Sequence, residues 1–381
     1  MLLALLLACR HTVSDDATGA PSPTADTATA TPFTSPEDPG PYDVGFTTIT
    51  FTDPRGKQLT AEVWYPAVPQ SGDPDRYEPL PIQGNAHRDA APAEGAPFPL
   101  LAFSHGFAGI RYQSIFLTEH LAGHGFVIVS PDHPNNTFLD LEEELSGQVL
   151  YERPDDIRFT VDEALRRSAA GDPILGGLLE PDAGYGMVGH SFGAITTMVL
   201  AGGIPDYEGV LTFCKTGDSL ACRYITDIDG IDAEGHGTRD ERVRWSVPMS
   251  PGLPFAFQLD GSGLAPVTNA LVLAGDRDDV LPYDTEALPV FAGLGHPKTL
   301  ATFADGGHYA FSDICLILAP LFPDCAEPDA GWIDIPQAQR ITRTVVTAYF
   351  GLHIKGDDRY TPWLEADTLA AFPELTWTVE P

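Results

Sequence analysis

The residues best suited to chemistry lie in one short segment, Gly189-His190-Ser191-Phe192-Gly193. A serine with glycines two positions before and after it is typical of a sharp strand-to-helix turn, because bulkier neighbours would clash there. Such a turn exposes the serine hydroxyl at the end of a strand, and the start of the following helix supplies N–H groups and positive potential. The segment therefore predicts that Ser191 is a nucleophile for acyl transfer, although the pentapeptide alone also fits a plain turn.

A serine hydroxyl needs an imidazole to accept its proton, and that imidazole needs a carboxylate to fix its tautomer. His308 is the predicted general base, because it follows the strand expected over residues 298–303 and comes after two glycines that suit a mobile loop. A surface histidine in a turn is the alternative interpretation. His190, beside the serine, is expected to pack against the sheet rather than to titrate in catalysis.

The carboxylate is expected directly after the strand predicted over residues 269–274, where three aspartates follow one another closely. The spacing from Gly275 to Pro282 favours Asp278 as the acid that orients His308. Asp276 and Asp279 remain alternatives for that role; otherwise they are solvated or cap the next helix.

Acyl transfer also needs hydrogen-bond donors for the oxyanion that develops on the substrate. One predicted donor is the backbone N–H of Phe192, directly after the nucleophile. The other is the N–H of Phe107, in the turn after the strand expected over residues 98–103. Asp132 and His133, which follow another strand, either line the pocket or form a plain turn.

These residues need a scaffold that brings several strand ends to one edge. Short apolar runs alternate with helical patterns, which predicts an α/β fold with a mostly parallel central sheet and helices on both faces. A leading hairpin, 46–51 with 59–65, comes first, and residues 66–97 are expected to form a long surface loop. The remaining expected strands are 98–103, 126–129, 184–190, 242–248, 269–274 and 298–303; the expected helices are 114–124, 154–170 (beginning at Pro154), 194–200 and 332–353.

Residues 203–242 lack a strong periodicity and follow the helix after the nucleophile. An insertion at this position would lie over the carboxyl edge of the sheet, where substrates bind in such folds. We therefore predict that this segment is a cap.

The chain has 381 residues, with 54 acidic and 21 basic side chains and a net charge of -33. Such a surface repels nucleic acid and anionic membranes, so neither is an expected partner. The charge is interpreted as a solubility feature. The predicted chemistry requires no cofactor and no metal.

The first nine residues end in Leu6-Leu7-Ala8-Cys9, which resembles a bacterial lipobox with Cys9 as the lipidated residue. The apolar run is too short to span a bilayer, and it lacks a basic n-region, which suggests a true start codon upstream. Residues 10–42, rich in Thr, Ala, Pro and Asp, are predicted to form a disordered tether, and 43–381 the catalytic domain. The expected location is the bacterial cell envelope, with membrane attachment only through a lipid on Cys9.

The other four cysteines are Cys214, Cys222, Cys315 and Cys325. An even number in an exported chain indicates disulfides, and four cysteines allow three pairings. Proximity favours Cys214 with Cys222 and Cys315 with Cys325. Zinc is the rival interpretation, but the chain has no Cys-x-x-Cys motif to support it.

Three stretches, 101–112, 121–129 and 189–193, resemble the platelet-activating-factor acetylhydrolase-like branch of the α/β-hydrolases, which adjoins dienelactone hydrolases and cutinase-like polyester hydrolases. The resemblance covers roughly residues 44 to 353. It implies a cofactor-free serine esterase for short acyl esters, with the acid and then the histidine following the serine. Animal acetylhydrolases of this branch place the acid after the sixth strand, where 246–252 here has no carboxylate, so phospholipid specificity is in doubt.

The resulting prediction is an exported, lipid-anchored serine carboxylesterase that uses Ser191, His308 and Asp278 and acts on small-molecule or lipid esters. The alternatives are a phospholipid deacetylase, a polyester hydrolase, a peptidase, or an inert surface binding protein on the same fold. The oligomeric state and the natural substrate are not predicted.

Overall fold

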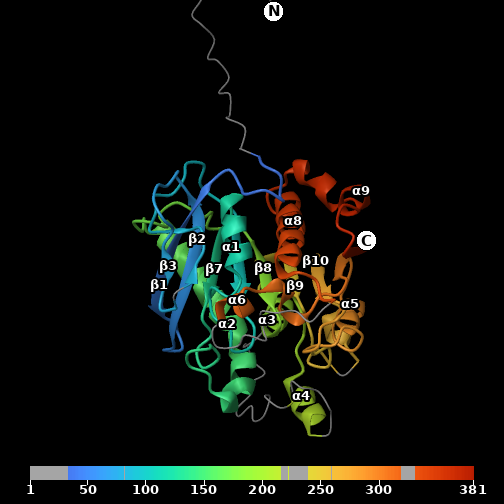
Figure 1. Cartoon of the computed structure of the whole chain (residues 1–381). Coiled ribbons are helices and arrows are strands. Elements are labelled where there is room, and N and C mark those ends of the chain that lie inside the picture. Colours follow the sequence, from blue (N-terminus) through green and yellow to red (C-terminus); the bar gives the residue numbers. More distant parts are fainter. Residues whose placement is uncertain (1–32, 81, 216–221, 223–238, 259, 319–330) are drawn as a thin grey trace, which may run out of the picture. The chain divides into compact units, whose positions relative to one another are not determined.

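A ten-stranded mixed sheet forms the centre of the molecule in the computed structural model, which describes residues 33–80, 82–215, 222, 239–258, 260–318 and 331–381 (Figure 1). The strands lie in the order β12-β11-β10-β9-β8-β6-β7-β2-β1-β5. Their bounds are β1 Asp43–Thr52, β2 Gln58–Ala67, β5 His87–Arg88, β6 Leu100–Ser104, β7 Val127–Pro131, β8 Tyr185–His190, β9 Val243–Met249, β10 Ala270–Gly275, β11 Lys298–Phe303 and β12 Leu375–Glu380, and a separate ribbon joins β3 Arg76–Tyr77 to β4 Ile82–Gln83.

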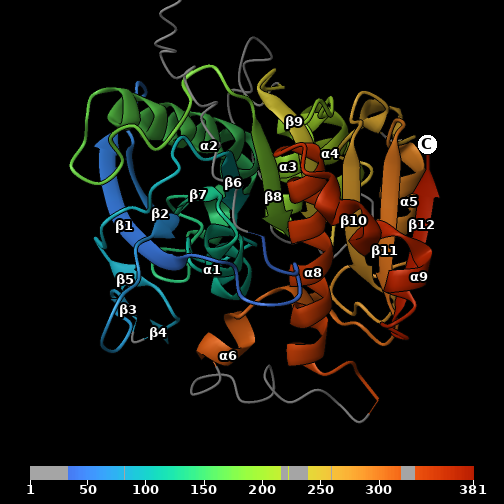
Figure 2. The same ribbon diagram turned by 90° about the horizontal axis from the view of Figure 1, so that it is seen from above.

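Helices cover both faces of this sheet, as the sequence predicted (Figure 2). Helices α1 (Ile115–Gly123) and α8 (Ile335–His353) pack on one face, and α2 (Ser146–Ala169), α3 (Phe192–Leu200) and α5 (Ala287–Gly293) pack on the other. The shorter helices are α4 Tyr207–Cys214, α6 Ile314–Leu318, α9 Ala366–Leu369 and the 3-10 turns η1 Glu143–Leu145, η3 Ser262–Leu264, η4 His308–Phe311 and η5 Asp358–Leu364.

The central strands are apolar on both sides because each side meets a layer of helices. In β6, Leu100 and Ala102 enter the core under α2 and α3, whereas Leu101 and Phe103 enter the core under α1 and α8. This alternation follows from the two-residue period of a strand.

Parallel pairing brings the proposed functional segments to one edge. β6, β8, β9, β10 and β11 run parallel, with Ser104 beside Gly189 and Gly275 beside Phe303 at their carboxyl ends. The turns that follow these strands therefore emerge on the same side, which is where ligands bind in open α/β sheets.

Two elements differ from the prediction. Helix α2 begins at Ser146, so Pro154 lies inside the helix rather than at its start. The residues before Pro154 include the buried Val149 and Leu150, and this tertiary packing outweighs the lost backbone hydrogen bond. Strand β12, which pairs antiparallel with β11, was not predicted, although Leu375, Trp377 and Val379 alternate with polar residues; none of its residues is fully buried.

The compact part of the chain begins earlier than the sequence indicated, at Phe33 rather than near residue 43. The Phe33 ring meets Tyr360 at 5.1 Å, and the Tyr42 N–H donates to the carbonyl of Gly123 at 3.1 Å. These long-range contacts order residues that are polar and unpatterned in sequence. The rest of the predicted tether and Cys9 lie outside the described residues.

Residues 66–97 also hold more structure than a surface loop. Tyr77 is fully buried, accepts a hydrogen bond from Trp64 Nε1 at 2.7 Å and donates one to Glu119 Oε1 at 2.6 Å. A buried phenol with two partners anchors this segment to β2 and α1, which the Pro- and Gly-rich composition did not reveal.

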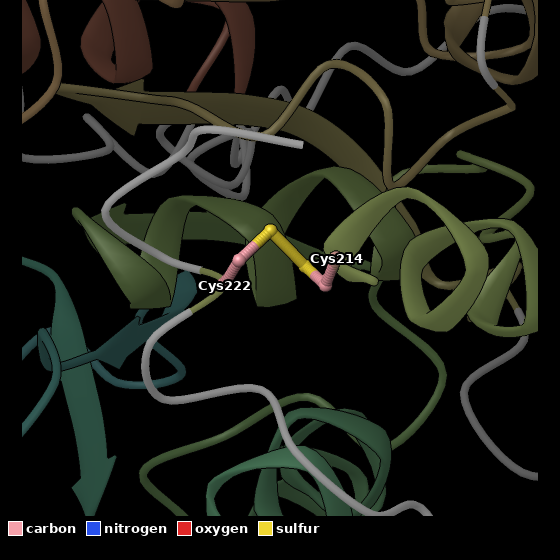
Figure 3. Close-up of a disulfide and its surroundings, with 2 residues drawn as sticks. All are labelled: Cys214 and Cys222. Carbon is pink, nitrogen blue, oxygen red and sulfur yellow. A yellow bond between two sulfur atoms is a disulfide. The ribbon is translucent and has the colours of Figure 1, made fainter. Parts of the chain in front are cut away.

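A disulfide joins Cys214, at the end of α4, to Cys222, with an S–S distance of 2.06 Å (Figure 3). This predicted pairing is confirmed. Cys315 is also disulfide-bonded, whereas its predicted partner Cys325 lies outside the described residues. None of the helices in the described ranges is both long and apolar enough to cross a bilayer.

The predicted cap is described only in part, because 216–221 and 223–238 lie outside the described residues. Helix α4 packs through Phe213, whose ring stacks on Phe255 at 4.2 Å, and through Tyr207, whose ring meets Tyr151 at 5.1 Å. These contacts join α4 to the loop after β9 and to α2. The cap role stays a prediction.

A buried carboxylate holds the leading hairpin against α2. Asp156 is fully buried and binds Arg55 Nη2 at 2.5 Å, Lys57 Nζ at 3.3 Å and His133 Nδ1 at 2.9 Å. It thus joins the β1–β2 turn to the turn after β7.

Replacing Asp156 with alanine should destabilise the protein by about 3–5 kcal/mol, since it removes the carboxylate that binds the buried His133 and one of the acidic partners of the half-buried Arg55 and Lys57. Urea unfolding followed by circular dichroism measures the effect. The matched control is Asp162→Ala, which removes an exposed ion pair with Arg242 and should change stability by less than about 1 kcal/mol. Equal effects of the two substitutions would contradict the assignment.

Candidate active site

Ser191 occupies a backbone conformation that L-residues rarely adopt, with φ 55° and ψ -117°. It lies between the end of β8 and the first residue of α3, and its N–H donates to the carbonyl of Met249 at 2.9 Å. The side chain is half-buried and thus reachable from outside. A strained, non-glycine residue at a strand-to-helix turn is the backbone signature of a nucleophile elbow.

Both glycines of the motif are needed for close backbone packing. A Cβ on Gly193 would run into the carbonyl of Ser104 at the end of β6, and a Cβ on Gly189 would run into the carbonyl of Gly193. Because these obstacles are backbone atoms, they cannot move aside cheaply. The spacing that identified the motif is therefore a steric requirement in the structure.

His308 and Asp278 form a close pair, with His308 Nδ1 2.7 Å from Asp278 Oδ2. Both side chains are buried, and the N–H groups of Val280 and Leu281 donate to the other oxygen, Asp278 Oδ1, at 3.0 and 2.7 Å. Burial alone would raise the pKa of Asp278, but the imidazole and these donors outweigh it and hold the pKa below its usual value. An ionised Asp278 fixes the proton of His308 on Nδ1 and directs Nε2 away from the carboxylate.

The two alternative aspartates lie elsewhere. Asp276 is exposed and accepts the N–H of Asp305 at 2.7 Å, and Asp279 is exposed beyond it. Only the middle carboxylate of the three meets the imidazole of His308 within the described ranges.

His190 connects the elbow to the loop that carries His308. Its Nε2 lies 2.8 Å from the backbone carbonyl of His308. The backbone of the proposed general base is therefore bound to the residue that directly precedes Ser191. Burial, followed by the nearby His308, lowers the pKa of His190 to about 3. This neutral, packed side chain matches the sequence expectation for His190.

The turn after β6 is held by two hydrogen bonds to one carbonyl group. The carbonyl of Gly106 accepts from His105 Nδ1 at 2.7 Å and from the N–H of Gly109 at 3.1 Å. That carbonyl and the N–H of Phe107 belong to one planar trans peptide and point in opposite directions. Fixing the carbonyl therefore fixes the direction of the Phe107 N–H.

Phe107 and Phe192, the two proposed oxyanion donors, lie together. Their rings meet edge to face with centroids 5.9 Å apart. The Phe192 N–H is at the start of α3, where backbone donors have no intrahelical acceptor. The guanidinium of Arg153 lies 4.8 Å from the Phe192 ring and also donates to the carbonyl of His105, so it links both donor segments.

A second Ser-His-Asp set lies close by and is not reachable. Ser104 Oγ is 2.9 Å from His133 Nε2, and His133 Nδ1 is 2.9 Å from Asp156 Oδ2. All three side chains are 0% exposed, and Ser104 Oγ also accepts from Arg153 Nη2 at 3.1 Å. This set is part of the core, so the pocket-lining interpretation of His133 is wrong.

Gln113 and Arg153 are the site residues that the sequence interpretation missed. Both are buried polar side chains: Gln113 lies in the turn before α1, and Arg153 lies in the part of α2 that precedes Pro154. Neither residue lies in a helix that the sequence predicted, and a long polar side chain gives by itself no signal that it is buried. Within the part of the chain that the structure describes, no cluster of three or more His, Cys, Asp or Glu could hold a metal ion.

The arrangement matches a known fold. No protein-family model matches the chain. A search of curated proteins finds no match either. Among solved structures, a ferulic acid esterase from Streptomyces cinnamoneus is similar, with a TM-score of 0.60 and 22% identity over 88% of this chain and 96% of that chain. The fold is that of the α/β-hydrolases.

Replacing Gly193 with alanine should destabilise the protein by at least about 1–3 kcal/mol and distort the elbow, because the new Cβ meets backbone. Thermal unfolding and esterase assays measure the two effects. Gly123→Ala is the control, since a Cβ there comes no closer than 3.5 Å to any neighbour. A fully stable Gly193→Ala protein would show that the packing at this turn is looser than described.

Proposed function

We propose that this protein is a serine-dependent carboxylic ester hydrolase. The observation that carries the proposal is the His308–Asp278 pair, held by the His190 hydrogen bond next to a serine in the left-handed conformation of an elbow. Similarity in fold to a ferulic acid esterase supports the same class of reaction.

In the proposed reaction Ser191 Oγ attacks the ester carbonyl while His308 Nε2 takes the hydroxyl proton. Asp278 keeps the Nδ1 proton in place and stabilises the imidazolium that forms. The N–H groups of Phe107 and Phe192 donate to the oxyanion. His308 then protonates the departing alcohol, and water releases the acyl group by the same steps in reverse roles.

Short acyl esters are the proposed substrates, following the resemblance to acetylhydrolase-like enzymes. That resemblance rests on sequence motifs, and the similar solved structure is a ferulic acid esterase, so no assignment to the acetylhydrolase-like branch follows. Phenolic acid esters therefore belong in the first substrate panel beside acetyl esters, acetylated phospholipid and polyester.

We also propose that the protein works outside the cytoplasm. The bridge between Cys214 and Cys222 and the bonded state of Cys315 support an oxidising compartment. Attachment through a lipid on Cys9 is the proposed means of retention at the cell surface. Mass spectrometry of Cys9 in the exported protein tests it.

Replacing Ser191 with alanine should abolish turnover of p-nitrophenyl esters and of methyl ferulate, because the acyl-enzyme can no longer form. Initial rates across acyl chain lengths measure the loss, and unfolding curves check that the fold is retained. Ser104→Ala is the informative comparison: it alters the buried Ser-His-Asp set and should leave an active nucleophile wherever the protein folds.

A fluorophosphonate probe separates the enzyme from an inert binding protein on the same fold. Labelling should modify Ser191 alone, as peptide mapping would show. Full activity in the Ser191→Ala protein, or labelling at another serine, would overturn the assignment.

Replacing Asp278 with asparagine should lower kcat by about 10⁴-fold, because the amide favours the wrong tautomer of the histidine. Stopped assays with p-nitrophenyl acetate detect the residual rate. Asp276→Asn is the matched control at an exposed position two residues away, and its kcat should stay within about twofold of the parent. The reverse ranking would assign the acid to Asp276.

A further inference from the structure

A directional chain of hydrogen bonds joins the oxyanion turn to the loop that carries His308. The N–H of Gly106 lies 2.9 Å from Gln113 Oε1, and Gln113 Nε2 lies 2.9 Å from His190 Nδ1. His190 Nε2 lies 2.8 Å from the carbonyl of His308. Gln113 and His190 are each 2% exposed, so solvent offers no replacement for either partner.

The backbone groups at the two ends determine every donor and acceptor between them. The N–H of Gly106 can only donate, so the amide oxygen of Gln113 must face it and the amide nitrogen must face His190. The carbonyl of His308 can only accept, so His190 carries its proton on Nε2 and accepts at Nδ1. The chain is complete with a neutral His190, in agreement with its lowered pKa.

The backbone of Gln113 makes a second attachment to the same loop. Its carbonyl accepts the N–H of Asp313 at 2.9 Å, and the Asp313 carboxylate accepts the N–H of Phe116 at 2.8 Å. Gln113 therefore contacts the segment that follows His308 directly through its main chain, and its side chain is connected to the His308 backbone through His190.

We propose that Gln113 and His190 are positioning residues that set the distance between the oxyanion donors, Ser191 and His308. The inference rests on the proposed function of these groups. Neither residue touches reacting atoms: Gln113 orients the Gly106 peptide that precedes Phe107, and His190 places the backbone of His308. A buried polar chain can do this because an unsatisfied member is costly, which leaves one arrangement of the three segments.

The decisive variant is Gln113→Glu, because a carboxylate has acceptors only. It accepts the N–H of Gly106, but its second oxygen faces the lone pair of His190 Nδ1. All hydrogen bonds of the chain can then form only while the introduced carboxyl or His190 carries one extra proton. The ratio of variant kcat to parent kcat should fall as pH rises and that proton is lost, reaching a deficit of about 100-fold, with KM little changed.

Dividing by the parent rate at each pH cancels the titration of groups that both proteins share. The titratable residues that face the chain are His105 beside the oxyanion turn, Asp278 and His308 beside His190, and Asp313 beside the backbone of Gln113. A ratio that changes with pH therefore reports the introduced carboxyl and His190.

Two further variants keep the test decisive if Gln113→Glu folds poorly. Gln113→Leu removes both side-chain bonds and should lower kcat at every pH, with a ratio to the parent that does not depend on pH. Since Gln113 and His190 are neighbours in one hydrogen-bonded chain, adding Gln113→Leu to a His190→Phe protein should lower kcat by a smaller factor than Gln113→Leu does in the parent. Gln337→Glu, at a half-buried amide on α8, is the control and should follow the pH dependence of the parent.

A pH-independent ratio for Gln113→Glu, or additive losses in the Gln113→Leu, His190→Phe double variant, would overturn the positioning role. Failure of the proposed function looks different: the Ser191→Ala protein would keep its activity, or the fluorophosphonate probe would label a serine other than Ser191. If the Ser191→Ala protein is inactive and the Gln113→Leu protein is fully active, the positioning role is rejected and the proposed function is kept.

Discussion

The left-handed backbone of Ser191 is the constraint on which the surrounding structure depends. At φ 55° and ψ -117° the chain reverses from β8 into α3 within one residue. That reversal brings α3 against the end of β6, where the carbonyl of Ser104 leaves no room for a side chain on Gly193. The turn after β6 must then lie beside the start of α3, and this is where both proposed oxyanion donors occur.

Buried hydrogen bonds supply the precision that apolar packing does not. Leucines and valines on the two faces of the sheet hold the strands together, but they tolerate small shifts between segments. The peptide groups around Gly106, by contrast, are bound by His105, Gln113 and Arg153 at defined atoms. Each bond has one donor and one acceptor, so a displaced turn leaves a buried polar group unsatisfied.

The two Ser-His-Asp sets show that residue types alone do not define a catalytic site. Ser104, His133 and Asp156 have the same connectivity as a catalytic triad, yet all are fully buried and surrounded by cations. The basic residues near them, such as Arg55 and Lys57, bind acidic groups of the interior. With only 21 basic residues against 54 acidic ones, this internal use of cations is consistent with an acidic exterior.

Local constraints were readable from the sequence alone. The elbow, the leading hairpin, the alternation of buried strands with helices and the Cys214–Cys222 bridge all arise from residues close together in the chain, through backbone sterics, periodicity and short loops. The same reasoning narrowed the proposed acid to three neighbouring aspartates and favoured Asp278, which lies against His308 in the structure.

Tertiary structure alone decided which polar groups meet across long separations. Gln113 lies 77 positions from His190, and His190 lies 118 positions from His308. The inclusion of Pro154 within α2 and the packing of residues 33–42 were decided in the same way, by contacts with distant elements. No periodicity records such pairings, because they depend on how whole elements dock and on the high cost of leaving a buried donor or acceptor unpaired.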